Sequence, residues 1–223
     1  MDSPWDNMYE KDPWSRERVI RSVRLLLPHL KDGDTVLDVG CFTQEARKYL
    51  PSTIKYIGVD SKAFKPDTIV CDLNYDFPPM KVTHALCMET LEHLSNPSKT
   101  LRSLLQSIDD HGFLVLSLPN EATIFHRLRG VFLGIVDSEC FAEEGKHLHL
   151  PSLSQCQQWF HRLGLYVESQ KFYISPLACN SRQAWVGQIL SLIPIPIHYF
   201  LARTWPSLFA RGFIFLLRRN PLS

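Results

Sequence analysis

The sequence has no run of basic residues, no paired cysteine motif and no turn rich in glycine. Its 223 residues contain 24 Lys and Arg against 23 Asp and Glu, a formal net charge of +1. Such a near-neutral balance excludes the electrostatic footprint of nonspecific nucleic-acid binding. The hydrophobic share of 45% and the charged share of 21% are ordinary for globular chains, which excludes disordered, collagen-like and coiled-coil proteins. Small molecules or local surface patches remain as partners.

Six cysteines are scattered along the chain without any C-x-x-C spacing, which argues against a zinc site or a disulfide framework. Residues 1–18 contain no apolar stretch of the kind found in secretory signals. We therefore expect reduced thiols and a cytoplasmic protein. Residues 183–202 lack Asp, Glu, Lys and Arg, but Pro194 and Pro196 would free backbone groups that lipid cannot satisfy. Buried packing or an interfacial segment is favoured there over a membrane span.

Short apolar runs alternate with amphipathic segments, which predicts a doubly wound α/β fold with a mostly parallel sheet. The length suits one domain over residues 1–223. Helix signals are clearest where Asn96 precedes Pro97 and where Ser152 and Gln155 form a capping box. The expected strands cover 35–39, 55–59, 68–71, 82–88, 113–118, 165–174 and 212–217, and the expected helices begin near 15, 44, 97 and 152. The helix beginning near 44 should run through Leu50 and be stopped by Pro51.

Acidic residues end four successive apolar runs: Asp38, Asp60, Asp72 and Glu89, the last followed by Glu92. Any one of these carboxylates is explained by helix capping, but four in corresponding positions indicate a ligand site at the carboxyl edge of the sheet. Asp60 lies twenty residues after Gly40, a separation that suits hydrogen bonds to ribose hydroxyls.

The turn after the first strand distinguishes between nucleotide ligands. A dinucleotide requires G-x-G-x-x-G so that backbone can approach the pyrophosphate, and residues 40–45 contain one glycine. A nicotinamide oxidoreductase is therefore disfavoured. A ligand with a ribose, no phosphates, and cationic sulfonium and ammonium groups suits a mouth ringed by carboxylates. S-adenosylmethionine is such a ligand.

Five motifs carry a family resemblance in order and spacing: VLDVGC from Val36, YIGVD from Tyr56, VCDL from Val70, CMETLEHL from Cys87 and GFLVLSLPN from Gly112. Together they resemble class I S-adenosylmethionine-dependent methyltransferases, closest to the branch with quinone-biosynthesis, small-molecule and glycolipid enzymes. The resemblance covers roughly residues 15–174 and the last strand. It implies a seven-stranded Rossmann-like sheet whose last strand is antiparallel.

The resemblance also implies which residues bind S-adenosylmethionine. Asp38 and Gly40 would face its methionine part, Asp60 its ribose, Asp72 and Leu73 its adenine, and Met88 and Glu89 would close the floor of the site. Cys41 and Ser61 are further expected cofactor-binding residues. The first loop departs from the family, which usually has further glycines where this chain has Phe42 and Gln44. Either Phe42 narrows the methionine pocket or the loop runs wider.

Three histidines are candidate catalytic bases because the fold would place them near the cofactor mouth: His93, His147 and His149. For each, capping or packing is the simpler explanation. No metal site is expected, because the sequence offers no third ligand at a useful spacing.

Two insertions, residues 121–150 and 177–211, are expected to form a substrate-facing or membrane-facing cap. Residues 124–132 have an apolar helical face opposite basic residues, so peripheral membrane contact through 121–150 and 183–205 is a hypothesis beside ordinary packing. The sequence thus predicts methyl transfer to a small-molecule or lipid-linked acceptor. The alternative is a noncatalytic scaffold with the same fold. Oligomeric state is not predicted.

Overall fold

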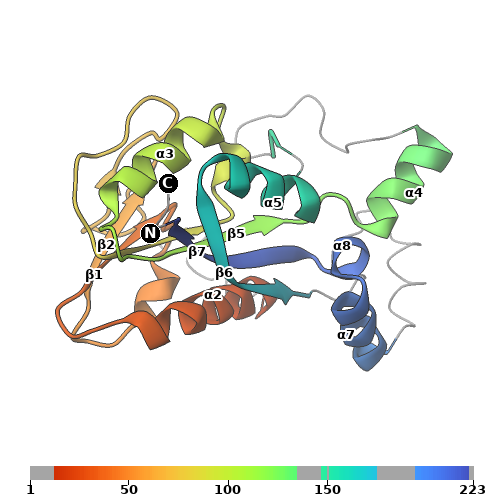
Figure 1. Ribbon diagram of the computed structural model, residues 1–223, viewed down its shortest axis with the longest axis horizontal. Helices are drawn as coiled ribbons and strands as arrows, with labels where there is room; N and C mark the ends of the chain where they lie inside the picture. The colour runs from red at the N-terminus through yellow and green to blue at the C-terminus, as the bar shows by residue number, and fades with distance from the viewer. Residues whose placement is uncertain (1–12, 135–146, 150, 175–193, 221–223) are drawn as a thin grey trace.

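A computed structural model describes residues 13–134, 147–149, 151–174 and 194–220 of the chain. One sheet of seven strands, in the order β3-β2-β1-β4-β5-β7-β6, runs through the described part (Figure 1). The strands are β1 (Thr35–Val39), β2 (Lys55–Asp60), β3 (Ile69–Val70), β4 (His84–Met88), β5 (Leu114–Pro119), β6 (Leu165–Tyr173) and β7 (Gly212–Arg219). Pairing is parallel from β3 to β5, whereas β7 is antiparallel to both β5 and β6. The predicted sheet is confirmed.

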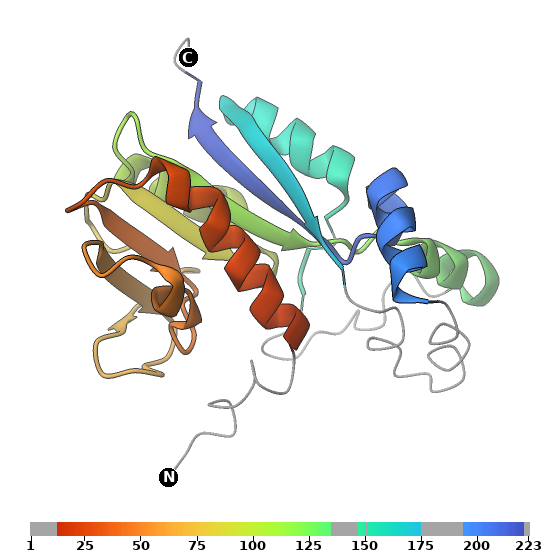
Figure 2. The same ribbon diagram turned by 90° about the horizontal axis from the view of Figure 1, so that it is seen from below.

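Helices cover both faces of the sheet. Figure 2 shows α2 (Pro13–Leu26) on one face, while α3 (Pro97–Ser107) and α5 (Leu153–Arg162) lie on the other. The apolar side of α2 packs Val19, Val23 and Leu26 into one core cluster with β1 and β5. A second, larger cluster lies under α3 and α5. The three central strands are buried on both faces, so they read in the sequence as continuous apolar runs.

The predicted helix caps are present. Asn96 Oδ1 accepts a hydrogen bond from Lys99 N at 3.0 Å at the start of α3. Ser152 and Gln155 form a reciprocal capping box at the start of α5. These local bonds satisfy amide groups that the first helical turn leaves without partners, which is why both helices begin where the sequence indicates.

The helix expected to run through Leu50 is wrong in type. The segment forms a short 3₁₀ helix, η2 (Glu45–Tyr49). Gln44, which precedes it, has a left-handed φ of 59°. Because Pro51 follows closely, only one or two turns remain, and the chain takes the tighter form used for short pieces.

Three further helices project beyond the carboxyl end of β5: α4 (Ile124–Leu133), α7 (Ile195–Thr204) and α8 (Pro206–Phe209) (Figures 1 and 2). They belong to the two predicted insertions, whose remaining segments 135–146, 150 and 177–193 lie outside the described residues. Within the described ranges, no helix has the length and apolar character needed to span a bilayer. For the apolar stretch 183–202, this finding covers only the part from Pro194 onward.

Candidate functional site

The carboxyl ends of β1, β2 and β4 meet at one edge of the sheet. Val39 is the register partner of both Val59 and Cys87. The chain then turns at Gly40, whose amide donates to the Val59 carbonyl at 2.8 Å. The predicted residues at the ends of the first, second and fourth strands, Asp38, Asp60 and Glu89, are thereby brought to one edge of the sheet, which we call the mouth.

Asp38 is buried beneath this mouth, with 1% of its surface exposed. Its Oδ2 accepts a hydrogen bond from the Tyr56 hydroxyl at 2.7 Å. Its Oδ1 has no hydrogen-bond partner among the described residues. Burial, with a smaller contribution from the charge of Asp60, raises the pKa of Asp38 to about 7, although Tyr56 opposes the shift. A buried carboxylate of this kind gains from a cationic partner.

Asp60 connects the end of β2 with the loop after β1. Its Oδ2 accepts from the Phe42 amide at 2.9 Å, and its Oδ1 accepts from the Lys62 amide at 3.3 Å and from the Ser61 hydroxyl at 3.4 Å. The residue is only partly buried. Each carboxylate oxygen can accept more than one hydrogen bond, so Asp60 retains capacity for ligand hydroxyls.

In the first loop, two residues other than glycine adopt the left-handed backbone that glycine usually provides. Phe42 and Gln44 have φ of 46° and 59°, and Gly40 has φ of 72°. Phe42 packs its ring against Phe64, with centroids 4.5 Å apart. The side-chain amide of Gln44 donates to Asp67 Oδ1 at 3.0 Å, which offsets part of the cost of left-handed backbone at a residue with a Cβ.

The remaining predicted cofactor residues flank the mouth. Cys41 and Leu73 are buried, whereas Ser61 and Asp72 are exposed. Asp72 Oδ1 accepts from the Asn74 amide at 2.9 Å, an interaction typical of a turn.

Beside the mouth, Met88 is partly buried, and Glu89 has a left-handed φ of 48°. Glu89 accepts a hydrogen bond from Tyr173 of β6 and lies 3.6 Å from Arg18 Nε of α2. Neither Tyr173 nor Arg18 is predicted as a site residue, because only the folded chain brings them to β4.

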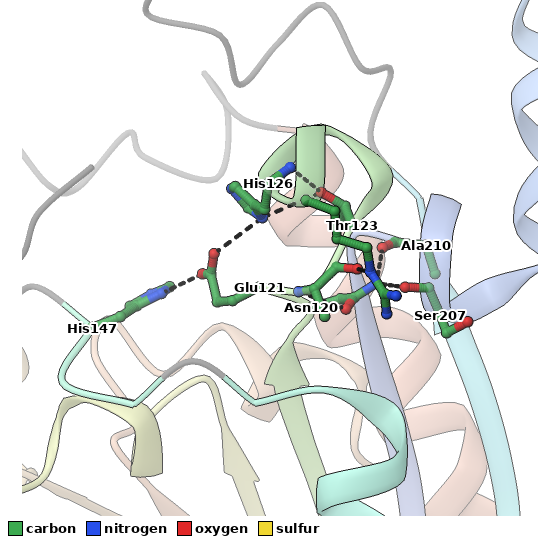
Figure 3. A network of polar contacts seen from close by, with 9 residues as sticks. Asn120, Glu121, Thr123, His126, His147, Ser207 and Ala210 are labelled. Atoms are coloured by element: carbon green, nitrogen blue, oxygen red, sulfur yellow. Dashed lines mark hydrogen bonds and ion pairs between the residues drawn. The ribbon is translucent and has the colours of Figure 1, made fainter. Parts of the chain in front are cut away.

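A carboxylate that the sequence does not single out, Glu121, organises the histidines (Figure 3). Its Oε1 lies 2.7 Å from His147 Nδ1, and its Oε2 lies 3.6 Å from His126 Nδ1. Burial lowers the pKa of His147, but the hydrogen bond to Glu121 and the charges of Glu92 and Glu121 outweigh burial and raise that pKa. The only sequence signal for Glu121 is its place two residues after the end of β5.

Glu92 lies next to these histidines, in the turn after β4. Its side chain is 0% exposed, and neither carboxylate oxygen has a hydrogen-bond partner among the described residues. Burial and then the charge of Glu89 raise the pKa of Glu92 to about 8. The rings of His93 and His147 lie 4.8 Å apart, whereas the third predicted histidine, His149, is exposed and has Nε2 2.9 Å from the Leu94 carbonyl.

Asn120 ties the end of β5 to α8 (Figure 3). Its side-chain amide donates to the carbonyls of Pro206, Ser207 and Ala210, at 2.9 Å for Ala210. The residue is 3% exposed, so these bonds are shielded from water. They fix the base of the projecting helices relative to the mouth.

Two cavities lie beside the sheet without including Asp38 or Asp60. One, of about 250 Å³, lies between residues 73–80 and α3, and the other, of about 270 Å³, lies between residues 43–48 and 65–67. The second cavity is lined by residues of the first loop, where the side chains of Gln44 and Arg47 bond to Asp67. Of the predicted cofactor residues, Leu73 alone lines either of these two cavities.

A family model described as a methyltransferase domain matches residues 12–170. The match spans β1 to most of β6, and therefore every residue discussed at the mouth except Tyr173. A comparison with curated proteins finds no match.

Many solved structures share the fold. A SAM-dependent methyltransferase from Archaeoglobus fulgidus is 19% identical, with a TM-score of 0.60 over 96% of this chain and 99% of that one. Magnesium protoporphyrin IX methyltransferase from Synechocystis PCC 6803, with bound SAH, is 14% identical, with a TM-score of 0.58 over 98% and 90%. A cyclase, SpnF, is 15% identical, with a TM-score of 0.57 over 90% and 80%. At these identities the structures establish the fold, and one fold serves more than one reaction.

Proposed function

Because the chain belongs to the methyltransferase domain family, we propose that it transfers the methyl group of S-adenosylmethionine to a lipid-linked or other amphiphilic small molecule. The chain is a SAM-dependent methyltransferase, and S-adenosylmethionine is its cofactor. What we propose beyond the family's activity is the class of methyl acceptor. It rests on the apolar surface beside the mouth.

The residues at the mouth suit this cofactor. The buried Asp38 Oδ1 lacks a hydrogen-bond partner among the described residues, so an ammonium group would satisfy it. Asp60, at the end of the second strand, would accept hydrogen bonds from the ribose hydroxyls. Gly40 brings backbone close to the ligand without a side chain in the way.

Methyl transfer places few demands on acid-base groups. S-adenosylmethionine supplies an activated methyl on a sulfonium whose positive charge is lost during the reaction. The chain must therefore align the acceptor, exclude water and hold the cofactor without cancelling its charge. A base helps where the acceptor carries a proton, and catalysis by His93, His147 or His149 stays a prediction.

Exposed apolar side chains on α4 and α7 carry the acceptor proposal. On α4, Val131 is 77% exposed and Phe132 is 76% exposed, and on α7, Phe200 is 65% exposed. Both helices lie at the end of the sheet that holds the mouth (Figure 1): α4 follows β5, and α7 leads through α8 to Gly212, which pairs with Pro119. Apolar side chains held in water beside a ligand mouth favour an amphiphilic partner.

Two cations accompany the apolar side chains. Arg127 on α4 and Arg203 on α7 are both exposed. This pairing of apolar and basic groups suits an interface with anionic lipid.

A labelling experiment tests the proposal. Purified protein and S-adenosylmethionine tritiated on its methyl group are used in three separate incubations. The first contains a detergent-dispersed lipid extract, the second a water-soluble metabolite extract and the third a protein fraction, all prepared from one batch of cells. We expect label in the organic phase of the first incubation only. Label confined to the water-soluble or protein fraction would contradict an amphiphilic acceptor.

The protein should bind anionic vesicles through α4 and α7. Replacement of Phe132 or Phe200 by Glu should lower the partition coefficient on phosphatidylglycerol vesicles by about 10-fold or more, since full burial of one such side chain is worth roughly 1.5–3 kcal/mol. Sedimentation at low salt measures this.

The matched control for these variants is Tyr166→Glu. Tyr166 is 52% exposed at the start of β6, away from the mouth, where the new carboxylate would meet Arg218. Equal losses in all three variants, or wild-type protein that stays in the supernatant, would contradict membrane contact through α4 and α7.

Cofactor affinity should depend on pH through Asp38. Its pKa of about 7 in the free protein means that the carboxylate is largely neutral below pH 7 and ionised above it. The cationic amino group of S-adenosylhomocysteine favours the ionised form. The Kd should therefore rise as pH falls below 7, by up to about 10-fold per pH unit.

An Asp38→Asn variant isolates this contribution, because Asn still accepts from Tyr56 but does not titrate. Its affinity should be weaker than that of wild type at pH 8 and should change less between pH 8 and pH 6. Calorimetric titration at both pH values measures the two slopes. Identical slopes in the two proteins would exclude Asp38 as the titrating group.

A further inference from the structure

A carboxylate and two imidazoles meet at the turn after β4. Glu92, His93 and His147 each offer a ligand atom, and these three atoms lie within 4.8 Å of one another. We propose that Glu92, His93 and His147 bind a divalent transition-metal cation of the Zn²⁺ or Mn²⁺ type. The sequence separates His147 from the other two residues by more than fifty positions, so only the fold assembles the set.

The state of Glu92 supports a metal site. Its side chain is 0% exposed, its Oε1 lies 4.0 Å from His93 Nε2, and both of its oxygens lack a hydrogen-bond partner among the described residues. Buried carboxylates in proteins are paired, hydrogen-bonded or bound to metal, because removing an unpaired charge from water is costly. The neighbouring carboxylate Glu89 adds repulsion, which a bound cation would relieve.

A hydrogen bond between Glu121 and His147 also supports a metal site. Glu121 Oε1 lies 2.7 Å from His147 Nδ1, which leaves Nε2 as the coordinating atom. Histidines that bind metal characteristically donate their other ring N–H to a carboxylate, which fixes the tautomer and the ring orientation. Glu121 is 18% exposed on its side chain, so this support is itself largely shielded from water.

Backbone hydrogen bonds hold the two segments that carry these residues together. The amides of Leu148 and His149 both donate to the Glu92 carbonyl, at 2.8 and 3.2 Å. His149 Nε2 also lies 2.9 Å from the Leu94 carbonyl. The segment that carries His147 is thus attached to the turn that carries Glu92 and His93.

The donor set indicates the kind of ion. Two imidazoles and one carboxylate suit Zn²⁺, Mn²⁺ or Fe²⁺, whereas Mg²⁺ and Ca²⁺ prefer oxygen ligands alone. Three protein ligands leave a position for water or, given the proposed function, for an oxygen of the methyl acceptor. A bound cation occupies His147 Nε2, so it would replace a general-base role for this residue.

Calorimetry on chelator-treated, full-length protein tests the proposal with Zn²⁺ and Mn²⁺, and Co²⁺ absorption reports the coordination geometry. We expect one equivalent of Zn²⁺ to bind with a Kd of about 1 μM or lower. Glu92→Gln and His147→Ala should each weaken binding by about 100-fold or more. Glu121→Gln, which alters only the support of His147, should weaken it by roughly 10–100-fold.

His161→Ala is the control, since His161 is an exposed histidine on α5 outside the cluster, and its affinity should match that of wild type. Glu92→Gln keeps the shape of a buried side chain and removes its charge, so it should stay folded by circular dichroism. Wild-type binding weaker than about 100 μM, or equal binding in wild type and Glu92→Gln, would overturn the metal site. A parallel titration with S-adenosylhomocysteine separates that failure from failure of the proposed function.

Discussion

An Asp60→Ala variant should lose at least about 100-fold in affinity for S-adenosylhomocysteine. Hydrogen bonds to a charged acceptor are each worth roughly 1.5–3 kcal/mol, and a ribose offers two hydroxyls to the carboxylate. The substitution also removes the acceptor for the Phe42 amide, which Asp60 Oδ2 holds at 2.9 Å. Loss of ligand contacts and loss of loop order therefore act in the same direction. Calorimetric titration measures the change.

Two further variants serve as comparisons for Asp60→Ala. Asp60→Asn keeps one acceptor oxygen and should lose less affinity than Asp60→Ala. Asp110→Ala removes an 88% exposed carboxylate that pairs with Arg219 and should bind as wild type does. If Asp60→Ala bound the ligand within a factor of three of wild type while folded, Asp60 would not be the ribose residue.

A Gly40→Ala variant should lose about 2–5 kcal/mol of the free energy of unfolding. Left-handed backbone costs a residue with a Cβ about 1–2 kcal/mol, and Gly40 has φ of 72°. A Cβ would also lie 2.1 Å from Thr90 Oγ1. Thr90 resists displacement because its hydroxyl hydrogen-bonds the carbonyls of Val39 and Met88 at 3.2 Å each. Overpacking of this kind adds roughly 1–3 kcal/mol.

Gly33 provides the matched control. Its φ is 88°, but no described atom beyond its chain neighbours would lie within 4 Å of a Cβ at this position, so Gly33→Ala should cost only the backbone part. A Gly40→Ala, Thr90→Ala double variant lacks the Thr90 methyl and hydroxyl groups that would collide with the new Cβ. It should therefore recover part of the lost free energy of unfolding. Urea unfolding measures all three. Equal losses for Gly33→Ala and Gly40→Ala would show that Thr90 does not confine the first turn.

Local rules account for the parts of the fold that the sequence predicted. Each central strand is apolar throughout because both of its faces are covered, and α3 and α5 begin at capping residues that bond within three positions along the chain. Parallel strands place their carboxyl ends together, so the rim of Asp38, Asp60 and Glu89 could be predicted without knowing any loop conformation.

Features that depend on distant contacts could not be predicted. The left-handed backbone at Phe42 and Gln44 is held by Asp60 and Asp67, from the end of β2 and the loop after it. The hydrogen bond between Glu121 and His147 joins two segments that are 26 positions apart in the sequence. No periodicity or spacing encodes such pairings, which is why the histidines lacked a third ligand in the sequence and gain Glu92 only in the structure.

Titration of the wild-type protein with S-adenosylhomocysteine at pH 8, where Asp38 is ionised, tests most directly whether the carboxyl ends of β1 and β2 form a cofactor site. We expect one ligand per chain, a Kd below about 1 mM, and loss of that binding in Asp60→Ala. Absence of binding at millimolar ligand, in protein that unfolds cooperatively, would contradict the enzymatic account and leave a scaffold with a methyltransferase fold.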